Sequence, residues 1–273
     1  MKHKIGLAAA LRSLVQILRG RAHVSASLTE NALLQTILRR RSVRSFRSQE
    51  IPDDVFAAIL EAGRLAPSTV NLQTWSFAVF DAALWRQTFD RRLPFGGQRA
   101  VIVIADTHRV RQVLDVFPYS PLVEHTVAVM NASLAAMNMT IAAEALGVSS
   151  VMLSESGRSG LLDGGYLRQR LGLPPTTTPL MTIVFGYARR AYPPMPPKLP
   201  AEQIFFSGRY PPVNEAVMQS WLTQMVAGYK ASHPLSSFDR QLQIYRDKIE
   251  QAEADLQAAV FYRPESTRHA PRC

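Results

Sequence analysis

Cysteine is nearly absent from this sequence. The one cysteine, Cys273, is the last of 273 residues, so no intrachain disulfide, thiolate metal site or internal catalytic cysteine can be proposed. This usage is typical of a reducing, cytoplasmic setting. The six histidines are scattered without the spacing of metal ligands, and no Ser-His-Asp order, GxGxxG loop or GxxxxGK loop occurs. The sequence therefore gives no support to a hydrolase or a metalloenzyme.

Long apolar runs are also missing. No run of 18 apolar residues occurs, so we expect no membrane-spanning helix. The first 20 residues combine a basic start with a short apolar run, but Arg12 interrupts that run and no small-x-small cleavage site follows. Four leucines share one helical face there, Leu7, Leu11, Leu14 and Leu18. We expect an amphipathic helix that packs on the protein body or on a second subunit, with a membrane-surface helix as the alternative.

Positive charge is concentrated near the amino-terminal end. The net charge is +10, and residues 1–50 contain ten Lys or Arg against Glu30 and Glu50, so most of the excess lies there. This distribution indicates a local anion site or a basic arm, because a protein that coats nucleic acid usually spreads its basic residues over a broad face. We therefore expect no nucleic-acid partner.

The hydrophobic fraction of 47% is enough for a substantial core. Apolar periodicity predicts helices at 27–40, from 53 to about 64, around Trp85, at 121–147, 164–174, 213–230 and 236–262. The first of these is predicted to begin at a cap on Ser27 or Thr29. Short β-branched and aromatic runs predict strands at 75–80, 99–106, 149–154 and 179–188.

The chain is predicted to have four parts. An amino-terminal amphipathic helical extension covers 1–26, the main domain 27–210, a carboxy-terminal helical extension 211–263, and a disordered tail 264–273. The stretch RRAYPPMPPKLP has five prolines in twelve residues, so it is expected to run as an extended surface segment.

Five arginines fall in nine positions from residue 39 to residue 47. A solvated charged face is the common explanation for such a cluster. An extended chain after the preceding helix would, however, send Arg40, Ser42 and Arg44 to one side. Two guanidiniums beside a hydroxyl form a set of donors that matches a phosphate dianion. The pattern therefore predicts phosphate binding.

At this point the sequence resembles a known family, the nitroreductase-like FMN-dependent flavoproteins. The resemblance is carried by successive blocks: RRRSVRSF, IPDDVFAAILEAGRLAPSTVNLQTWSFAVF, NMTIAAEALGVSSVML, LRQRLGLPPTTTPLMTIVFGYA and KLPAEQIFF. They occur in the family's order from about residue 30 to residue 206. The resemblance implies that 27–210 is an FMN-binding domain.

The resemblance implies an α+β fold in which helices wrap a mainly antiparallel sheet, in a domain-swapped homodimer with FMN at the interface. It also implies an NAD(P)H-dependent FMN oxidoreductase. A hydride would pass from NAD(P)H through flavin N5 to a nitroaromatic, quinone or similar small-molecule acceptor, in two half-reactions. A flavin supplies the redox chemistry itself, so no catalytic side chain is expected.

The resemblance also assigns a set of cofactor-binding residues. In the family's pattern the first block holds the FMN phosphate and ribityl chain, the second reaches the flavin from the other subunit, the third faces its O4 and N5 edge, and a later lysine binds the phosphate. The corresponding residues here are, in that order, Arg40, Arg41, Ser42 and Arg44; Pro67, Ser68, Thr69, Asn71 and Gln73; Met152, Leu153 and Ser154; and Lys198.

Two alternatives stay open. Relatives with the same fold dehalogenate iodotyrosine, cleave flavin or oxidise azolines, although the dehalogenase Glu-Tyr-Lys set is not found in residues 107–125. The chain could also be a flavin-binding sensor or partner protein in which the two extensions carry the function. The acceptor and the choice between NADH and NADPH have no signal in the sequence.

Overall fold

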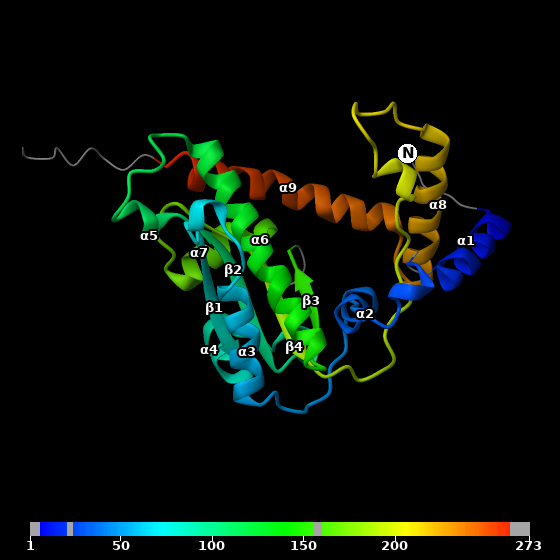
Figure 1. Ribbon diagram of the computed structural model, residues 1–273, viewed down its shortest axis with the longest axis horizontal. Helices are drawn as coiled ribbons and strands as arrows, with labels where there is room; N and C mark the ends of the chain where they lie inside the picture. The colour runs from blue at the N-terminus through cyan, green and yellow to red at the C-terminus, as the bar shows by residue number, and fades with distance from the viewer. Residues whose placement is uncertain (1–5, 21–23, 155–159, 263–273) are drawn as a thin grey trace, which may run out of the picture. The chain divides into compact units, whose positions relative to one another are not determined.

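The computed structural model describes residues 6–20, 24–154 and 160–262, and the tail predicted at 264–273 lies outside them (Figure 1). The chain divides into two compact units. The sheet unit consists of Gln35–Ala191 and Lys248–Cys273, and the helical unit consists of Met1–Leu34 and Tyr192–Asp247. The predicted cofactor-binding residues belong to the sheet unit, except Lys198, which belongs to the helical unit.

A four-stranded sheet forms the centre of the sheet unit. Its strands are β1 (Trp75–Asp81), β2 (Arg99–Asp106), β3 (Ser149–Leu153) and β4 (Thr177–Gly186). They lie in the order β1-β2-β4-β3, and every neighbouring pair is antiparallel. The observed strands overlap all four predicted segments, and β1 and β3 are the two edges of the sheet.

Helices and short 3-10 turns connect and cover these strands (Figure 1). In chain order they are α2 (Ala32–Arg39), which enters the unit, α3 (Asp53–Arg64), η2 (Thr69–Asn71), α4 (Ala82–Phe89), η3 (Pro94–Gly96), α5 (His108–Arg111), α6 (Pro121–Ala145), η4 (Leu161–Asp163), α7 (Gly164–Leu171) and the last part of α9 (Phe238–Val260).

The side chains of β2 alternate between two cores. Val101, Val103 and Ala105 pack with α3 and α6 on one face of the sheet. The residues between them, Ala100, Ile102 and Ile104, pack with α4 and α7 on the other face. Alternation of this kind follows from the two-residue period of a strand. The sheet is therefore covered by helices on both faces, and the predicted α+β sandwich is confirmed.

α6 is the central helix of the first core. Gly63 of α3 lets the two helices approach closely, because a Cβ placed on it would lie 2.7 Å from Met139 Cγ of α6. Within the described ranges, α6 alone has the length and composition to cross a membrane, yet it is buried along one side, as a core helix is. Gly147, at a φ of 75°, follows its last turn, as a glycine commonly does at the end of a helix.

In the helical unit, η1 (Ala26–Leu28) and η5 (Ala201–Gln203) are short turns, and α1 (Leu7–Arg19) packs on α8 (Glu215–Ser232). Ser13 is buried, and a Cβ on Gly228 of α8 would lie 3.3 Å from Ile17 Cδ1. Leu11 and Leu18 are 64% and 72% exposed. The helix was predicted correctly, and its packing on α8 agrees with the expected contact with the protein body. The packing of the exposed leucines on a second subunit stays a prediction. The side chain of Leu7 lies outside the described residues.

The start of α2 also differs from the prediction. Leu34 N donates to Asn31 Oδ1 at 2.9 Å, so Asn31 is the capping residue. Thr29 instead donates its hydroxyl to Ala26 O at 2.7 Å. The predicted cap at Ser27 or Thr29 was wrong because polar residues compete for this role over several positions, and only the path of the chain selects one.

Candidate cofactor site

The basic segment, residues 40–44, leaves α2 and runs beside the edge strand β3. Ser42 forms a parallel bridge with Ser150, and Val43 N donates to Ser150 O at 3.0 Å. Val43 is buried in a small apolar cluster with side chains of β3 and β4. Because neighbouring residues of an extended chain face opposite sides, the buried valine turns Ser42 and Arg44 away from this cluster.

The arginines of this segment fall into two groups. Arg41 donates from Nη1 to Leu38 O at 2.7 Å and to Arg40 O at 2.9 Å, so it satisfies carbonyls at the end of α2. Arg40 and Arg44 have no ion pair or hydrogen bond from their guanidiniums within the described residues. Two unpaired guanidiniums beside one hydroxyl are the donor set that a phosphate dianion fits.

The end of β3 lies next to the basic segment. Ser42 is in register with Ser150, and the chain after Arg44 then pairs with the residues that follow β4, where Phe46 lies opposite Ala188 and Arg47 N donates to Tyr187 O at 2.8 Å. The bridge at Ser42 and Ser150 is isolated, and within the described residues no further pairing covers that edge of β3. The backbone of Met152 and Leu153 is therefore available to a ligand on this side, while Leu153 pairs with β4 on the other.

The loop 67–73 joins α3 to β1 in a strained conformation. Val70, Asn71 and Gln73 have φ values of 50°, 56° and 49°, which are uncommon for residues other than glycine and rare for a β-branched residue. Ser68 Oγ accepts a hydrogen bond from Gln73 N at 3.1 Å. Val70 is 86% exposed. Strain of this kind persists where the surroundings fix it, and it is common at ligand-binding sites.

Asn131 of α6 holds this loop in place. Its Oδ1 accepts from Thr69 N at 3.0 Å and from Thr69 Oγ1 at 3.2 Å, and its Nδ2 donates to Thr74 Oγ1 at 2.8 Å. Asn131 is 1% exposed. Asn131 was not predicted as a site residue, although one amide inside the apolar run VMNASLAAM is a visible signal, since buried polar groups require partners.

The predicted residues are brought together in two groups rather than one. The basic segment and the end of β3 lie at one edge of the sheet, whereas the loop 67–73 leads into β1 at the other edge. Between β1 and Ser42 stand β2, β4 and β3, so the two chains are four inter-strand spacings, or about 19 Å, apart. Pro67, Ser68, Thr69, Asn71 and Gln73 therefore do not join the basic segment through the sheet of one chain.

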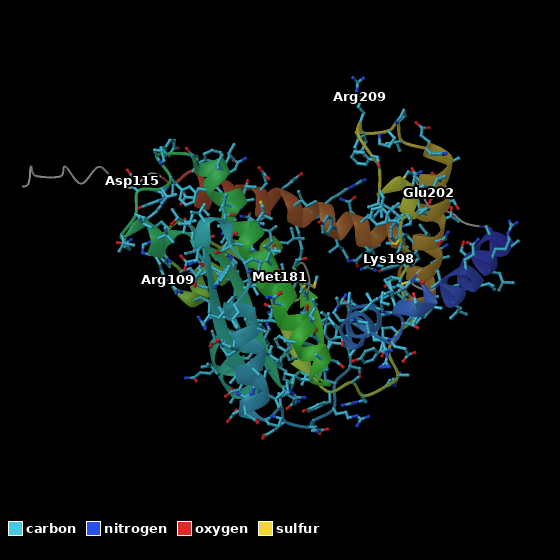
Figure 2. The ribbon with its side chains drawn as sticks, in the orientation of Figure 1. Arg109, Asp115, Met181, Lys198, Glu202 and Arg209 are labelled. Carbon is cyan, nitrogen blue, oxygen red and sulfur yellow. The ribbon has the colours of Figure 1, made fainter. Side chains whose placement is uncertain are left out.

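Lys198 lies in the helical unit, on the extended segment that precedes α8 (Figure 2). It is exposed and lines a hollow of about 320 Å³ with Asn214, Val217, Trp221 and others. Asn214 caps α8 by accepting from Val217 N at 3.2 Å. Within this unit the lysine thus lies beside a mixed polar and apolar surface of α8 and contacts none of the other predicted site residues.

A buried acid lies at the start of α6, away from the predicted groups. Glu124 is 4% exposed and accepts hydrogen bonds from Thr107 and from Arg111, whose Nε lies 2.6 Å from Glu124 Oε1. The bond to Glu124 raises the pKa of Arg111. This ion pair ties the segment after β2 to α6.

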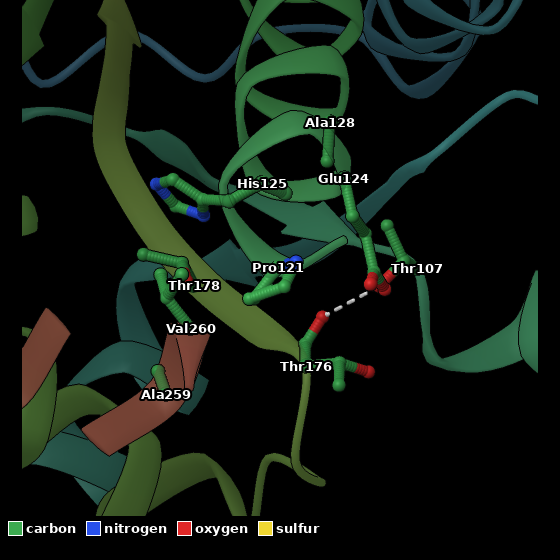
Figure 3. A pocket seen from close by; sticks show the side chains of 10 residues that line it. Thr107, Pro121, Glu124, His125, Ala128, Thr176, Thr178, Ala259 and Val260 are labelled. Carbon is green, nitrogen blue, oxygen red and sulfur yellow. Dashed lines mark hydrogen bonds between the residues drawn. The ribbon is translucent and has the colours of Figure 1, made fainter. Parts of the chain in front are cut away.

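His125, the histidine beside this acid, lines a cavity of about 20 Å³ with Glu124, Thr176 and the last turn of α9 (Figure 3). Such a cavity holds about one water molecule, not a flavin. Burial lowers the pKa of His125, and the nearby Glu124 opposes this shift in part. In Figure 3 the imidazole and the Glu124 carboxylate point in different directions.

Two further polar features complete the description of the sheet unit. Arg109, labelled in Figure 2, pairs with Asp106 at the end of β2, and both bond to Ser76 of β1. Among the described residues, no cluster of His, Cys, Asp or Glu could hold a metal ion. The arrangement as a whole offers unpaired cations, an open strand edge and a strained polar loop, which can bind an anionic cofactor.

Comparison with known families and proteins gives a consistent picture. The family model described as "Nitroreductase family" matches residues 37–91 and 88–187. A protein of Archaeoglobus fulgidus whose name pairs NADH dehydrogenase with NAD(P)H nitroreductase is 32% identical over 162 residues, which are 57% of this chain and 85% of that protein. The NADPH-flavin oxidoreductase of Vibrio harveyi is 25% identical over 207 residues, which are 73% of this chain and 83% of that enzyme.

A solved structure shares the fold. The NADPH:FMN oxidoreductase from Vibrio harveyi complexed with NAD+ matches with a TM-score of 0.66 at 20% identity, over 85% of this chain and all of that one. The family match contains the basic segment, the loop 67–73 and β3, but not Lys198, α8 or α9.

Proposed function

The chain belongs to the nitroreductase family, and we propose that it passes electrons from NAD(P)H to a nitroaromatic, quinone or similar acceptor in two half-reactions. It is an NAD(P)H-dependent oxidoreductase with FMN as its cofactor, like the relatives named NADPH-flavin and NADPH:FMN oxidoreductase. When bound, FMN supplies the redox chemistry, taking a hydride at N5 and giving electrons to the acceptor.

One observation carries the assignment of the site. Arg40 and Arg44 have unpaired guanidiniums on either side of Ser42, beside an open strand edge. Two guanidiniums and a hydroxyl on a backbone that is fixed by pairing with β3 form a donor set that fits an anionic ligand. We assign Arg40 and Ser42 to the phosphate. Arg44 would place a fixed charge at the pyrimidine edge of the ring, where a preorganised cation can contribute a few kcal/mol.

The remaining groups have complementary tasks. The end of β3, at Met152, Leu153 and Ser154, presents backbone groups to the ring edge. Lys198 adds a second charge for the phosphate. Protons come from solvent, so no general acid is assigned.

The geometry favours a site shared between two copies of the chain. The loop 67–73 leads into β1 and the basic segment lies beside β3, at opposite edges of the sheet, so a site that uses both fits two copies of the chain better than one. A homodimer with FMN at its interface would place Asn71 and Gln73 of one copy beside Arg44 of the other. The single cysteine supports a cytoplasmic setting.

Flavin content and turnover test this proposal. The purified protein should be yellow, release FMN on heating, and oxidise NADH or NADPH faster when a quinone or nitroaromatic is added. A flavin-binding sensor would be yellow but would turn over slowly or not at all. A colourless protein that takes up no added FMN would contradict the proposal.

Charge removal at matched positions locates the site. Arg40→Ala should weaken FMN binding by about 10- to 100-fold, because a hydrogen bond to a charged group contributes about 1.5–3 kcal/mol. Arg47→Ala removes the same charge from the same cluster and should leave FMN binding within about twofold of wild type. Equal losses in both variants would indicate a general charge effect rather than a site.

A further inference from the structure

The last part of α9 makes two polar contacts with one short segment of the sheet unit. Asp255 Oδ2 accepts a hydrogen bond from Gly165 N at 2.9 Å. Lys248 Nζ lies 3.2 Å from Asp163 Oδ2. Ala252 and Ala259 of the same helix are buried, so the helix is packed as well as hydrogen-bonded there.

The contact at Gly165 is a helix cap supplied by a different helix. Gly165 is the second residue of α7, and Asp163 before it makes no capping bond with its own side chain. The first amides of a helix have no partner within it, and a carboxylate there is favoured by the helix dipole. Asp255 thus satisfies an amide that the segment itself leaves open.

Gly165 leaves room for this approach. A Cβ placed on Gly165 would lie 2.6 Å from Asp255 Oδ2 and 2.9 Å from Asp255 Cγ, so a side chain there would push the carboxylate aside. The hydrogen bond in its present geometry therefore depends on a glycine at this position.

The same segment is bonded on its other side to the end of β3. Leu162 N donates to Ser154 O at 3.1 Å. Gly160 packs on the strand, since a Cβ there would meet Leu153 O at 2.9 Å and Leu180 O at 2.8 Å. Residues 160–165 therefore connect α9 to the strand end at which the flavin edge is assigned.

We propose that α9 is a positioning element for the cofactor: Asp255 and Lys248 fix residues 160–165, and these fix the end of β3 through the Ser154 carbonyl. This inference rests on the proposed function, because it requires FMN at β3. Neither residue touches the cofactor in this scheme, so both are positioning residues. α9 lies outside the family match, which ends at residue 187. The two contacts of α9 with residues 160–165, here called the brace, are therefore a feature of this chain's own carboxy-terminal helix.

The test compares two carboxylates on one helix. Asp255→Asn removes the charge but keeps an acceptor oxygen, and Asp255→Ala removes both. Glu253→Gln is the matched control, because Glu253 is exposed and accepts from Gln257 Nε2 at 2.9 Å. Backbone hydrogen exchange of residues 160–165, the dissociation constant for FMN and the flavin midpoint potential are measured on each full-length variant.

Loss of a helix cap changes the equilibrium for local opening of the capped segment by about fivefold. Asp255→Ala should therefore raise exchange at Leu162 and Gly165 about fivefold, weaken FMN binding by about two- to fivefold and shift the midpoint potential. Asp255→Asn should show the same changes at smaller size, and it serves as the test if the alanine variant does not fold. Glu253→Gln should show none of them.

The outcomes separate this inference from the proposed function. Wild-type exchange in Asp255→Ala would show that no brace exists. Faster exchange with unchanged FMN affinity and potential would show that the brace does not reach the cofactor, which also overturns the inference. A wild-type protein that binds no FMN would instead overturn the proposed function, whatever the exchange rates are.

Discussion

Replacing Asn131 with alanine tests whether one buried amide holds the loop 67–73 in its strained form. The amide accepts two hydrogen bonds from Thr69 and donates one to Thr74. Both the amide and Thr74 are buried, at 1% and 0% exposure. Alanine removes all three bonds and provides no replacement.

The expected loss is dominated by groups left without partners. An unsatisfied buried donor or acceptor costs about 1–3 kcal/mol, and here the buried Thr74 hydroxyl loses its donor. Thr69 is exposed, so its amide and its hydroxyl can turn to solvent and add little. We therefore expect Asn131→Ala to lower the free energy of unfolding by about 2 kcal/mol, which corresponds to roughly 4–8 °C in Tm for a domain of this size.

Asn138 provides the matched control on the same helix. Among the described residues its side chain makes one hydrogen bond, from Nδ2 to Ala62 O at 3.1 Å, and it is only partly buried. Asn138→Ala should cost about 1 kcal/mol or less. Thermal unfolding of both variants without cofactor gives the stability difference, and backbone hydrogen exchange of residues 67–73 reports on the loop itself.

The loop should also relax in the Asn131 variant. Val70, Asn71 and Gln73 hold positive φ values that cost of order 1–3 kcal/mol each, so a loop released from α6 can return to ordinary conformations. FMN binding should then weaken at temperatures where the protein remains folded. Equal Tm changes in the two asparagine variants, with exchange in the loop at the wild-type rate, would refute this account of Asn131.

Three further predictions concern other residues. Arg41→Ala should lower Tm by about 2–4 °C in the protein without cofactor, because it removes a cap worth about 1 kcal/mol; an unchanged Tm in thermal unfolding would contradict the capping role. Burial lowers the pKa of His125 in the folded protein below the value of about 6.5 that it has in the unfolded chain. Neutral His125 therefore contributes to folding stability above about pH 6.5, and this contribution is lost as the pH falls toward the pKa of the folded state. The Tm of His125→Asn should therefore fall less than the Tm of wild type between about pH 7 and pH 5. If the two Tm values fall equally over this range, the prediction is wrong. Trp85 Nε1 is buried without a partner in the described part of the chain, so Trp85→Phe should cost less than about 1.5 kcal/mol in denaturant unfolding, well below the 2–5 kcal/mol of Ile59→Ala.

The central sheet was predictable because its signal is local. Each strand is a short β-branched or aromatic run, and β2 (RAVIVIAD) was located to the residue. The long helix α6 was predictable for the same reason, from its apolar length and the glycine that follows it. The order β1-β2-β4-β3 was not, since pairing depends on contacts between distant segments.

The site shows the same division between local and distant signals. The alternation of Arg40, Ser42 and Arg44 could be predicted from the sequence. The hydrogen bonds of Arg41 to carbonyls at the end of α2 could not, because they depend on where that helix ends. Asn131 bonds to residues 57 and 62 positions away along the chain. No local pattern joins such residues, although a buried amide in an apolar helix indicates that some partner exists.

The extensions were the least predictable part. Periodicity identified α1 and α9 as helices, but it did not show that α8 is the neighbour of α1 and did not reveal the contact of Asp255 with Gly165. Helix faces are selected by the neighbours that cover them, and those neighbours lie far away in sequence. The division into 1–26, 27–210, 211–263 and a tail stays a prediction.

Complementation between two inactive variants tests most directly whether two copies of the chain share one flavin. One variant carries Arg40→Ala with Arg44→Ala, and the other carries Ser68→Ala with Asn71→Ala. If each site takes its arginines from one copy and its loop from the other, mixed dimers contain one site with all four residues intact, and about a quarter of the sites in a fully exchanged equimolar mixture should regain FMN and turnover. If both groups served the same site within one chain, every site in the mixture would remain defective, and no recovery above the separate variants would contradict the account.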